Sequence, residues 1–326
     1  MQPMFGFKHY MHCAAVVVAA IGTAVPAYAQ QYPAKIVRVI VPFAPGGGSD
    51  ISARRFSAKL TSVLGQQFIV DNRGGAAGLI GMELTAKAPP DGYTIMIMSG
   101  SFSATSATQK PAFDPINTII PIAEFGITPF VLTVHPSVPV KSTKELIALA
   151  RAKPGDFSYA NTGVGGFTHL ATEYFSSQAK IKMVGIPYKS TGAGMADLLS
   201  GQVPIICGSL LPVVPHLKTG KLRGLGVSTL KRWYSLPDLP AVSETLPGFD
   251  VVLWFGAMAP RGTPQPIIDR LNGALNDILK MDDVKTSLER EGMQATGGPP
   301  EAFDKRIRTD YERWTKLIKE TNLVFK

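Results

Sequence analysis

The sequence predicts an α/β protein of two domains, each with a parallel-type sheet. Short β-branched, apolar segments alternate with helical segments of about 10–15 residues, which is typical of right-handed βαβ units. The chain has 326 residues, a length that favours about two domains. Its composition, 45% hydrophobic and 17% charged, excludes a disordered chain, because such chains have too few apolar residues to form a core.

The first half of the alternation begins with an apolar strand over 35–43, which the glycine-rich segment 44–50 ends. A helix is expected over 51–64, because apolar residues recur there at helical spacing and Gly65 suits a C-cap. A second strand is expected over 68–70, a second helix over 76–88 and a third strand over 93–98.

The alternation resumes after residue 130. The expected strands cover 131–134, 157–160, 184–187, 203–207, 222–228 and 251–257. The expected helices cover 143–152, 166–179, 193–199, 211–219, 264–280, 283–290 and 300–321. No period of 20–50 residues repeats, which argues against a solenoid or a propeller.

Residues 1–29 are typical of a cleavable secretory signal peptide. A basic segment with Lys8 precedes an apolar stretch over 13–26, and Ala27-Tyr28-Ala29 forms an A-x-A cleavage site. A transmembrane anchor would need about 20 apolar residues. We therefore expect cleavage after Ala29 and export to the periplasm.

The chain is basic, with 33 Lys and Arg against 24 Asp and Glu and a formal charge of +9. Such a balance suits a nucleic acid, an anionic membrane surface or a small acid. Export argues against a nucleic-acid partner, and the sequence has no Lys/Arg-rich block, zinc-finger spacing or aromatic RNA-binding signature. A small acid is the partner that we expect.

Cys207 would be the one cysteine left after cleavage, so no intramolecular disulfide is expected. It lies in the apolar segment 203–207, where a small buried hydrophobe is a better interpretation than a nucleophile. It is nevertheless included below among the candidate ligand-binding residues.

The segment Pro45-Gly46-Gly47-Gly48-Ser49-Asp50 joins an expected strand to an expected helix. Glycines allow close approach of backbone N–H groups to a ligand, and a helix N-terminus carries a partial positive charge. The segment is therefore a candidate anion site made of main chain. A tight turn in which Ser49 or Asp50 merely caps the helix is an equally good interpretation. The pattern matches neither a P-loop nor G-x-G-x-x-G, so nucleotide binding is poorly supported.

Three further loops follow expected strands, at 99–103, 161–168 and 189–194. Ligands of open α/β sheets lie outside the carboxyl ends of the strands, so these loops and 44–50 should surround the ligand. The candidate ligand-binding residues are Phe43, Pro45, Gly46, Gly47, Gly48, Ser49, Asp50, Ser99, Ser101, Thr162, Gly165, Gly166, Phe167, Thr168, His169, Thr191, Ala193 and Cys207.

The sequence gives no positive sign of catalysis. His169 and Glu173 are four residues apart on an expected helix, but no H-E-x-x-H motif is present and two residues cannot complete a zinc site. No G-x-S-x-G nucleophile motif is found either. We expect neither a metal nor a cofactor, and no enzymatic activity.

Several motifs together resemble the Bug receptors, the extracytoplasmic solute-binding proteins of tripartite tricarboxylate transporters. The matching segments are Val41-Pro42-Phe43-Ala44-Pro45-Gly46-Gly47 with Asp50, Val70-Asp71-Asn72-Arg73-Gly74-Gly75, Pro90-Asp91-Gly92-Tyr93, His169-Leu170-Ala171, Pro187-Tyr188-Lys189 and Leu236-Pro237-Asp238-Leu239-Pro240. The chain departs from the family pattern at Pro204, where an acidic residue is common, and at Gly48-Ser49.

The resemblance implies a type II periplasmic-binding-protein fold whose ligand cleft lies between two domains, here 30–102 plus 225–326 and 103–224. It implies a monomer that captures a small carboxylate, aromatic or dicarboxylic, by cleft closure, and delivers it to the membrane components of a transporter. Two alternatives stay open. One is an exported enzyme acting on small acids, with His169 in a catalytic role. The other is a ligand-sensing receptor partnered with a sensor kinase.

Overall fold

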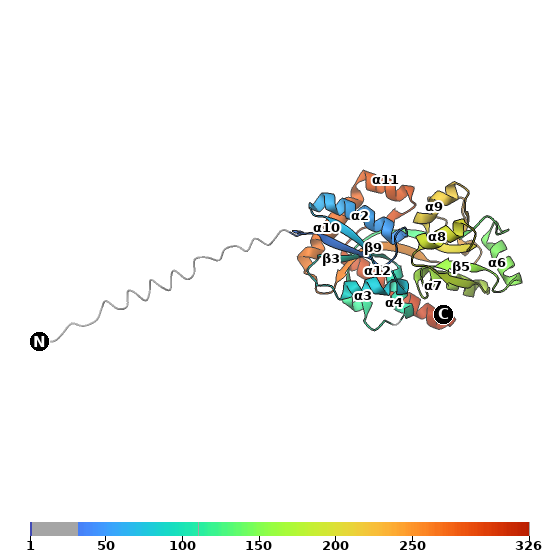
Figure 1. Ribbon diagram of the computed structural model, residues 1–326, viewed down its shortest axis with the longest axis horizontal. Coiled ribbons are helices and arrows are strands. Elements are labelled where there is room, and N and C mark those ends of the chain that lie inside the picture. Colours follow the sequence, from blue (N-terminus) through green and yellow to red (C-terminus); the bar gives the residue numbers. More distant parts are fainter. Residues whose placement is uncertain (2–31, 110, 326) are drawn as a thin grey trace.

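The computed structural model describes residues 1, 32–109 and 111–325. Except for Met1, the expected signal peptide lies outside the described residues. Figure 1 shows that the described chain forms two groups of elements around a central sheet, with α6 to α9 gathered around β5 and with α2, α10 and α11 on the other side of the molecule. No helix of the described chain combines the length and apolar character that a membrane span requires.

The strands of the described residues form one sheet in the order β2-β1-β3-β9-β4-β7-β5-β6, with β8 and β10 paired to β4 beside this path. Their bounds are β1 Val37–Val41, β2 Phe68–Asn72, β3 Thr94–Ser99, β4 Ile119–Val134, β5 Ser158–Asn161, β6 Val184–Pro187, β7 Ile205–Ser209, β8 Arg223–Val227, β9 Val252–Pro260 and β10 Gln294–Ala295.

The sheet is mixed, because antiparallel strands join the parallel ones that the sequence predicts. Strand β1 is parallel to β2 and β3, and β5 is parallel to β6 and β7. Strands β4 and β9 are antiparallel to each other, and each is antiparallel to its other neighbour on the path. The βαβ pattern predicts the parallel strands because each crossover helix returns the chain in the same direction. The pattern carries no information about β4 and β9, which lie between the two groups of parallel strands.

Strand β4 has 16 residues, whereas the sequence predicted a strand only over 131–134. Pro121, Glu124 and Pro129 lie within it, and prolines argue against a central strand. Its pairing shifts register between Pro121 and Ala123 and again between Glu124 and Gly126. Bulges of this kind accommodate residues that would interrupt a regular ladder.

Strand β4 also connects two parts of the sheet. Residues Ile119 to Pro129 pair with β9, beside β3, β1 and β2. Residues Phe130 to Val134 pair with β7 and β8. We call the strands on the β9 side of β4 the first half-sheet and those on the β7 side the second half-sheet.

The helices agree with the predicted ones except over 76–88 and in α4 and α5, which were not predicted as helices. Their bounds are α2 Gly48–Leu64, α3 Leu79–Ala86, α4 Ser101–Gln109, α5 Pro115–Thr118, α6 Thr143–Ala152, α7 Phe167–Ala179, α8 Thr191–Leu199, α9 Leu210–Lys218, α10 Gln265–Lys280, α11 Asp282–Arg290 and α12 Pro300–Thr321, with 3₁₀ turns η1 Ala76–Gly78 and η2 Val242–Glu244.

The helix expected over 76–88 is divided into η1 and α3, because Ala77 and Gly78 have φ angles of 55° and 103°. Such left-handed angles end a helix. Helix α4 was predicted as a loop, since serine and threonine favour caps and turns over helix interiors. Tertiary contacts override that preference here. Ser103 Oγ donates to the Ile307 carbonyl of α12, and Thr105 Oγ1 donates to the Ala77 carbonyl.

Apolar faces of the helices cover the sheet. Phe56 of α2 stacks on Phe125 of β4, with ring centroids 3.9 Å apart. On α10, Ile268, Leu271 and Leu275 are buried at helical spacing. Burial of these rings and aliphatic side chains fixes α2 and α10 against the first half-sheet, so the N-terminus of α2 is held rigidly where β1 ends.

Candidate functional site

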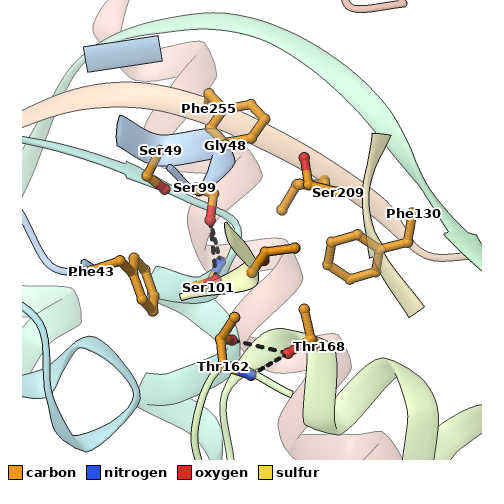
Figure 2. A pocket seen from close by; sticks show the side chains of 13 residues that line it. Phe43, Gly48, Ser49, Ser99, Ser101, Phe130, Thr162, Thr168, Ser209 and Phe255 are labelled. Carbon is orange, nitrogen blue, oxygen red and sulfur yellow. Dashed lines mark hydrogen bonds between the residues drawn. The ribbon is translucent and has the colours of Figure 1, made fainter. Parts of the chain in front are cut away.

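A cavity of about 30 Å³ lies between the two half-sheets, at the carboxyl ends of β1, β3, β5 and β7. Figure 2 shows Phe43 on one side of it, Phe130 on the other, and serine and threonine hydroxyls between them. Its lining residues are Phe43, Gly47, Gly48, Ser49, Ser99, Ser101, Phe130, Thr162, Thr168, Thr191, Ser209, Leu253 and Phe255. Every one of these side chains is neutral.

Half of the predicted ligand-binding residues line this cavity. The structure brings together Phe43, Gly47, Gly48, Ser49, Ser99, Ser101, Thr162, Thr168 and Thr191. The other nine do not line it: Pro45, Gly46, Asp50, Gly165, Gly166, Phe167, His169, Ala193 and Cys207. Several of these hold the lining residues in place, as described below. A role of the lining residues in ligand binding stays a prediction.

Four lining residues were not predicted: Phe130, Ser209, Leu253 and Phe255. Ser209 ends β7, the same position relative to its strand that Ser99 has in β3, so the strand-end argument could have found it. Leu253 and Phe255 lie in a strand that is apolar throughout, where the sequence does not reveal which side chains face the cavity.

Five helices point their N-termini at the cavity. Lining residues occupy the first turn of α2, α4, α7 and α8, and Ser209 is the N-cap of α9. The backbone N–H groups of a first turn have no partner within the helix, and together they carry about half a positive charge. Five such termini around a cavity without a carboxylate favour an anion.

The hydroxyls on one side of the cavity pair with one another. Thr168 Oγ1 accepts from the Thr162 amide at 2.8 Å and lies 2.9 Å from Thr162 Oγ1. Ser99 Oγ donates to Ser101 Oγ at 3.0 Å. Figure 2 shows both contacts. These pairs fix the orientation of the hydroxyls before any ligand arrives.

Asp50 holds the loop that precedes α2. Its carboxylate accepts from the Gly46 amide, Arg54 Nε and Asn72 Nδ2, each at 3.0 Å. Burial alone would raise the pKa of Asp50, but these hydrogen bonds outweigh burial and hold its pKa below the usual range. Asp50 is therefore an ionised residue that positions the loop, although it does not reach the cavity.

His169 holds a second loop. Its Nδ1 accepts from the Gly165 amide at 3.0 Å, and its ring lies near Tyr159 and Phe325. Burial lowers the pKa of His169 to about 4, so the ring is neutral at pH 7. A neutral imidazole can accept this hydrogen bond, whereas an imidazolium cannot.

Cys207 is buried in the apolar core beneath the cavity. Burial raises the pKa of its thiol to about 12, so the reactive thiolate is not formed at neutral pH. This agrees with its interpretation as a small core residue. Within the described residues, no cluster of three or more His, Cys, Asp or Glu side chains could hold a metal ion.

The loops on the two walls of the cleft touch. The Ala44 amide donates to the Lys189 carbonyl at 3.2 Å, and Ser190 Oγ donates to the Pro45 carbonyl at 3.3 Å. Thr108 and Gln109 of α4 donate to the carbonyls of Gly165 and Val164. The structure therefore has a closed cleft.

Residues 52–323 match the family model described as "Tripartite tricarboxylate transporter family receptor". Protein BugT of Bordetella pertussis is 33% identical over 315 residues, which cover 95% of this chain and 97% of that protein. A protein from the tcbD-tcbE intergenic region of Pseudomonas sp. strain P51 is 35% identical over 295 residues, or 90% of this chain and 88% of that protein.

A solved structure with the same fold is R. palustris Rpa4515 with adipate, with a TM-score of 0.86, 33% identity and coverage of 89% of this chain and 98% of that chain. The sequence-based resemblance is thus confirmed, and so is the two-domain α/β fold of a periplasmic binding protein. The chain belongs to the receptor family of tripartite tricarboxylate transporters, the periplasmic solute-binding proteins that include the Bug proteins.

Proposed function

We propose that this protein captures a small carboxylate in the periplasm and delivers it to the membrane components of a tripartite tricarboxylate transporter. The observation that carries the proposal is the set of five helix N-termini around a cavity whose lining is entirely neutral. Backbone N–H groups and hydroxyls can donate to a carboxylate, and no lining carboxylate repels it.

The relatives support a carboxylate as the ligand class. Rpa4515 was solved with adipate and MatC of Rhodopseudomonas palustris with malate; MatC has a TM-score of 0.85 and 29% identity to this chain. Both ligands are small dicarboxylates. The aromatic walls formed by Phe43, Phe130 and Phe255 are equally suited to an aromatic acid, so the panel tested below includes one.

Binding would couple to cleft closure. The cavity is lined from both half-sheets, by Gly48 and Ser99 on one side and by Thr168 and Thr191 on the other. A ligand that contacts both walls stabilises the closed state over the open one. We propose that each half-sheet with its helices is one lobe. Because β4 pairs with β9 through Pro129 and with β7 from Phe130, the boundary is better placed there than near residue 103.

We propose a binding role without catalysis. The two side chains with nucleophile or general-base chemistry that the sequence singled out, Cys207 and His169, do not line the cavity. The buried His169 Nδ1 is already engaged by the Gly165 amide. Neither side chain is therefore placed to activate a nucleophile against a bound acid.

Calorimetric titration tests the proposal. Purified protein would be titrated with succinate, malate, adipate, hexanoate and benzoate, and we expect one of these acids to bind with 1:1 stoichiometry and to raise the melting temperature. Ligand recovered unchanged after long incubation would support a receptor over an enzyme. Binding of none of the acids, with a neutral or cationic solute bound instead, would refute carboxylate capture. Uptake of the bound acid, lost on deletion of the receptor and restored by its return, tests delivery.

A further inference from the structure

Ser209 carries a buried hydroxyl that faces the cavity and has no hydrogen-bond partner within the described residues. Its side chain is only 4% exposed. A buried hydroxyl without a partner destabilises the folded state, so such groups are uncommon unless a ligand or water satisfies them. Ser209 therefore marks a place where a polar group is expected.

The local sequence removes one of the usual hydrogen-bond partners of this hydroxyl. Ser209 is the N-cap of α9, and an N-cap serine normally accepts from the amide at the second or third helical position. The third position of α9 is Pro212, which has no N–H. Ser209 makes no capping hydrogen bond. Both the hydroxyl and the first amides of α9 are thus left without the usual capping contact.

The opposite wall presents a matching arrangement. Helix α2 begins at Gly48 after Gly47, an N-cap that has no side chain to cap the helix. A Cβ atom on Gly48 would lie 2.9 Å from Ser209 Oγ and 2.8 Å from Phe255. The uncapped N-termini of α2 and α9 therefore face each other from different half-sheets.

We propose that Ser209 is a ligand-binding residue, and that one carboxylate of the ligand lies between the N-termini of α2 and α9. The Ser209 hydroxyl donates to this carboxylate from the second half-sheet, and the first amides of α2 donate to it from the first. This proposal rests on the proposed capture of a carboxylate. In this arrangement a single carboxylate contacts both half-sheets, so its binding stabilises the closed cleft.

The test compares Ser209→Ala with Ser57→Ala by calorimetric titration of the same five acids. Ser57 is a matched control, because its hydroxyl on α2 is also buried and without a partner but does not line the cavity. Loss of a hydrogen bond to a charged group should raise Kd about 10- to 100-fold in Ser209→Ala. Ser57→Ala should bind like wild type. The ligand-free melting temperature of both variants should equal or exceed that of wild type, since each removes an unsatisfied polar group.

Pro212→Ala provides a second, independent variant. It restores an N–H at the third position of α9, so Ser209 should cap the helix and lose its contact with the ligand. We expect a higher ligand-free melting temperature together with weaker binding, and no added loss in the double variant with Ser209→Ala.

Three results would overturn the inference. The first is wild-type affinity in Ser209→Ala for an acid that the wild type binds. The second is a lower melting temperature of ligand-free Ser209→Ala alongside the weaker binding, which would assign the hydroxyl a structural role. The third is a loss confined to acids with two polar ends, which would place Ser209 at a different group of the ligand. If wild type binds none of the acids, the proposed capture of a carboxylate fails. If wild type binds an acid and Ser209→Ala binds it equally tightly, only the role of Ser209 fails.

Discussion

A Cβ atom on Gly192 would lie 2.6 Å from the carbonyl oxygen of Gly46, on the opposite wall of the cleft. Gly192 is the second residue of α8 in the second half-sheet, and Gly46 precedes α2 in the first. Only a hydrogen at this position allows the two backbones to approach so closely. Closure of the cleft therefore depends on the absence of a side chain at residue 192.

The Gly192→Ala variant should accordingly bind its ligand less tightly. The added methyl group clashes in the closed state and is free in the open state, so closure becomes less favourable and Kd should rise at least about tenfold. Small-angle X-ray scattering with saturating ligand should show a larger radius of gyration than wild type. Gly273→Ala is the control, because Gly273 lies on the exposed face of α10 with open space around it. Equal affinity in both variants would contradict the prediction.

Ser228 links the segments that connect the half-sheets. Its Oγ accepts from the Phe130 amide at 2.8 Å and donates to the Val251 carbonyl. Ser228→Ala leaves both backbone groups buried without this partner and should lower the free energy of unfolding by about 1–3 kcal/mol in urea titrations. Ser243→Ala removes a more exposed hydroxyl that donates to the Leu230 carbonyl, and its effect should stay within about 0.5 kcal/mol. Comparable losses in the two variants would refute a special role for Ser228.

Asp50 should stabilise the folded state only while it is ionised. Since its folded-state pKa lies below the usual value of 3.8, its contribution is present above pH 3.8 and is lost as the pH falls through the lowered pKa. At neutral pH, Asp50→Asn should be less stable than wild type by about 1–3 kcal/mol, and the difference should shrink in acid. Asp277→Asn, which removes an exposed pair with Lys280, should change stability by less than about 0.5 kcal/mol. A difference for Asp50→Asn that persists unchanged below pH 3 would count against this account.

Because of His169, the free energy of unfolding should decrease as the pH is lowered. Its pKa is about 4 when folded against 6.5 when unfolded, so the unfolded chain takes up the proton first. The contribution of the neutral ring is complete above pH 6.5 and decreases by about 3 kcal/mol between pH 6.5 and 4. Burial raises the pKa of nearby Glu173. Glu173 therefore has the opposite effect on stability as the pH falls and offsets part of the loss caused by His169. Urea titrations across the range should show a flatter profile for His169→Gln than for wild type; parallel profiles would contradict the assignment.

The sequence predicts most of the regular elements of this fold because their patterns are local. Helix α6 begins and ends at the predicted residues, since Ser142 caps it by accepting from the Glu145 amide and its buried side chains recur at helical spacing. Strand β6 also matches its predicted bounds. The first twelve residues of β4 and the whole of α4 were missed, because prolines and hydroxyl residues carry the wrong local preference and distant contacts decide their structure.

The residues that line the cavity also fall into those that the sequence could predict and those that it could not. Residues at or after the ends of parallel strands, such as Ser49, Ser99 and Thr162, could be predicted because the carboxyl ends of these strands meet at one edge. Phe130, Leu253 and Phe255 could not, since they come from antiparallel strands whose place between the two parallel groups leaves no local pattern. Asp50 and His169 were predicted as ligand contacts. The structure places them one layer behind the cavity, where they hold the loops that line it.

The neutral lining of the cavity has an electrical consequence. An anion taken up there meets dipoles and hydroxyls only, so no counter-ion from the lining cancels its charge. The loaded receptor then differs from the empty one by the full valence of its cargo, and its isoelectric point should be lower by an amount that reports that valence.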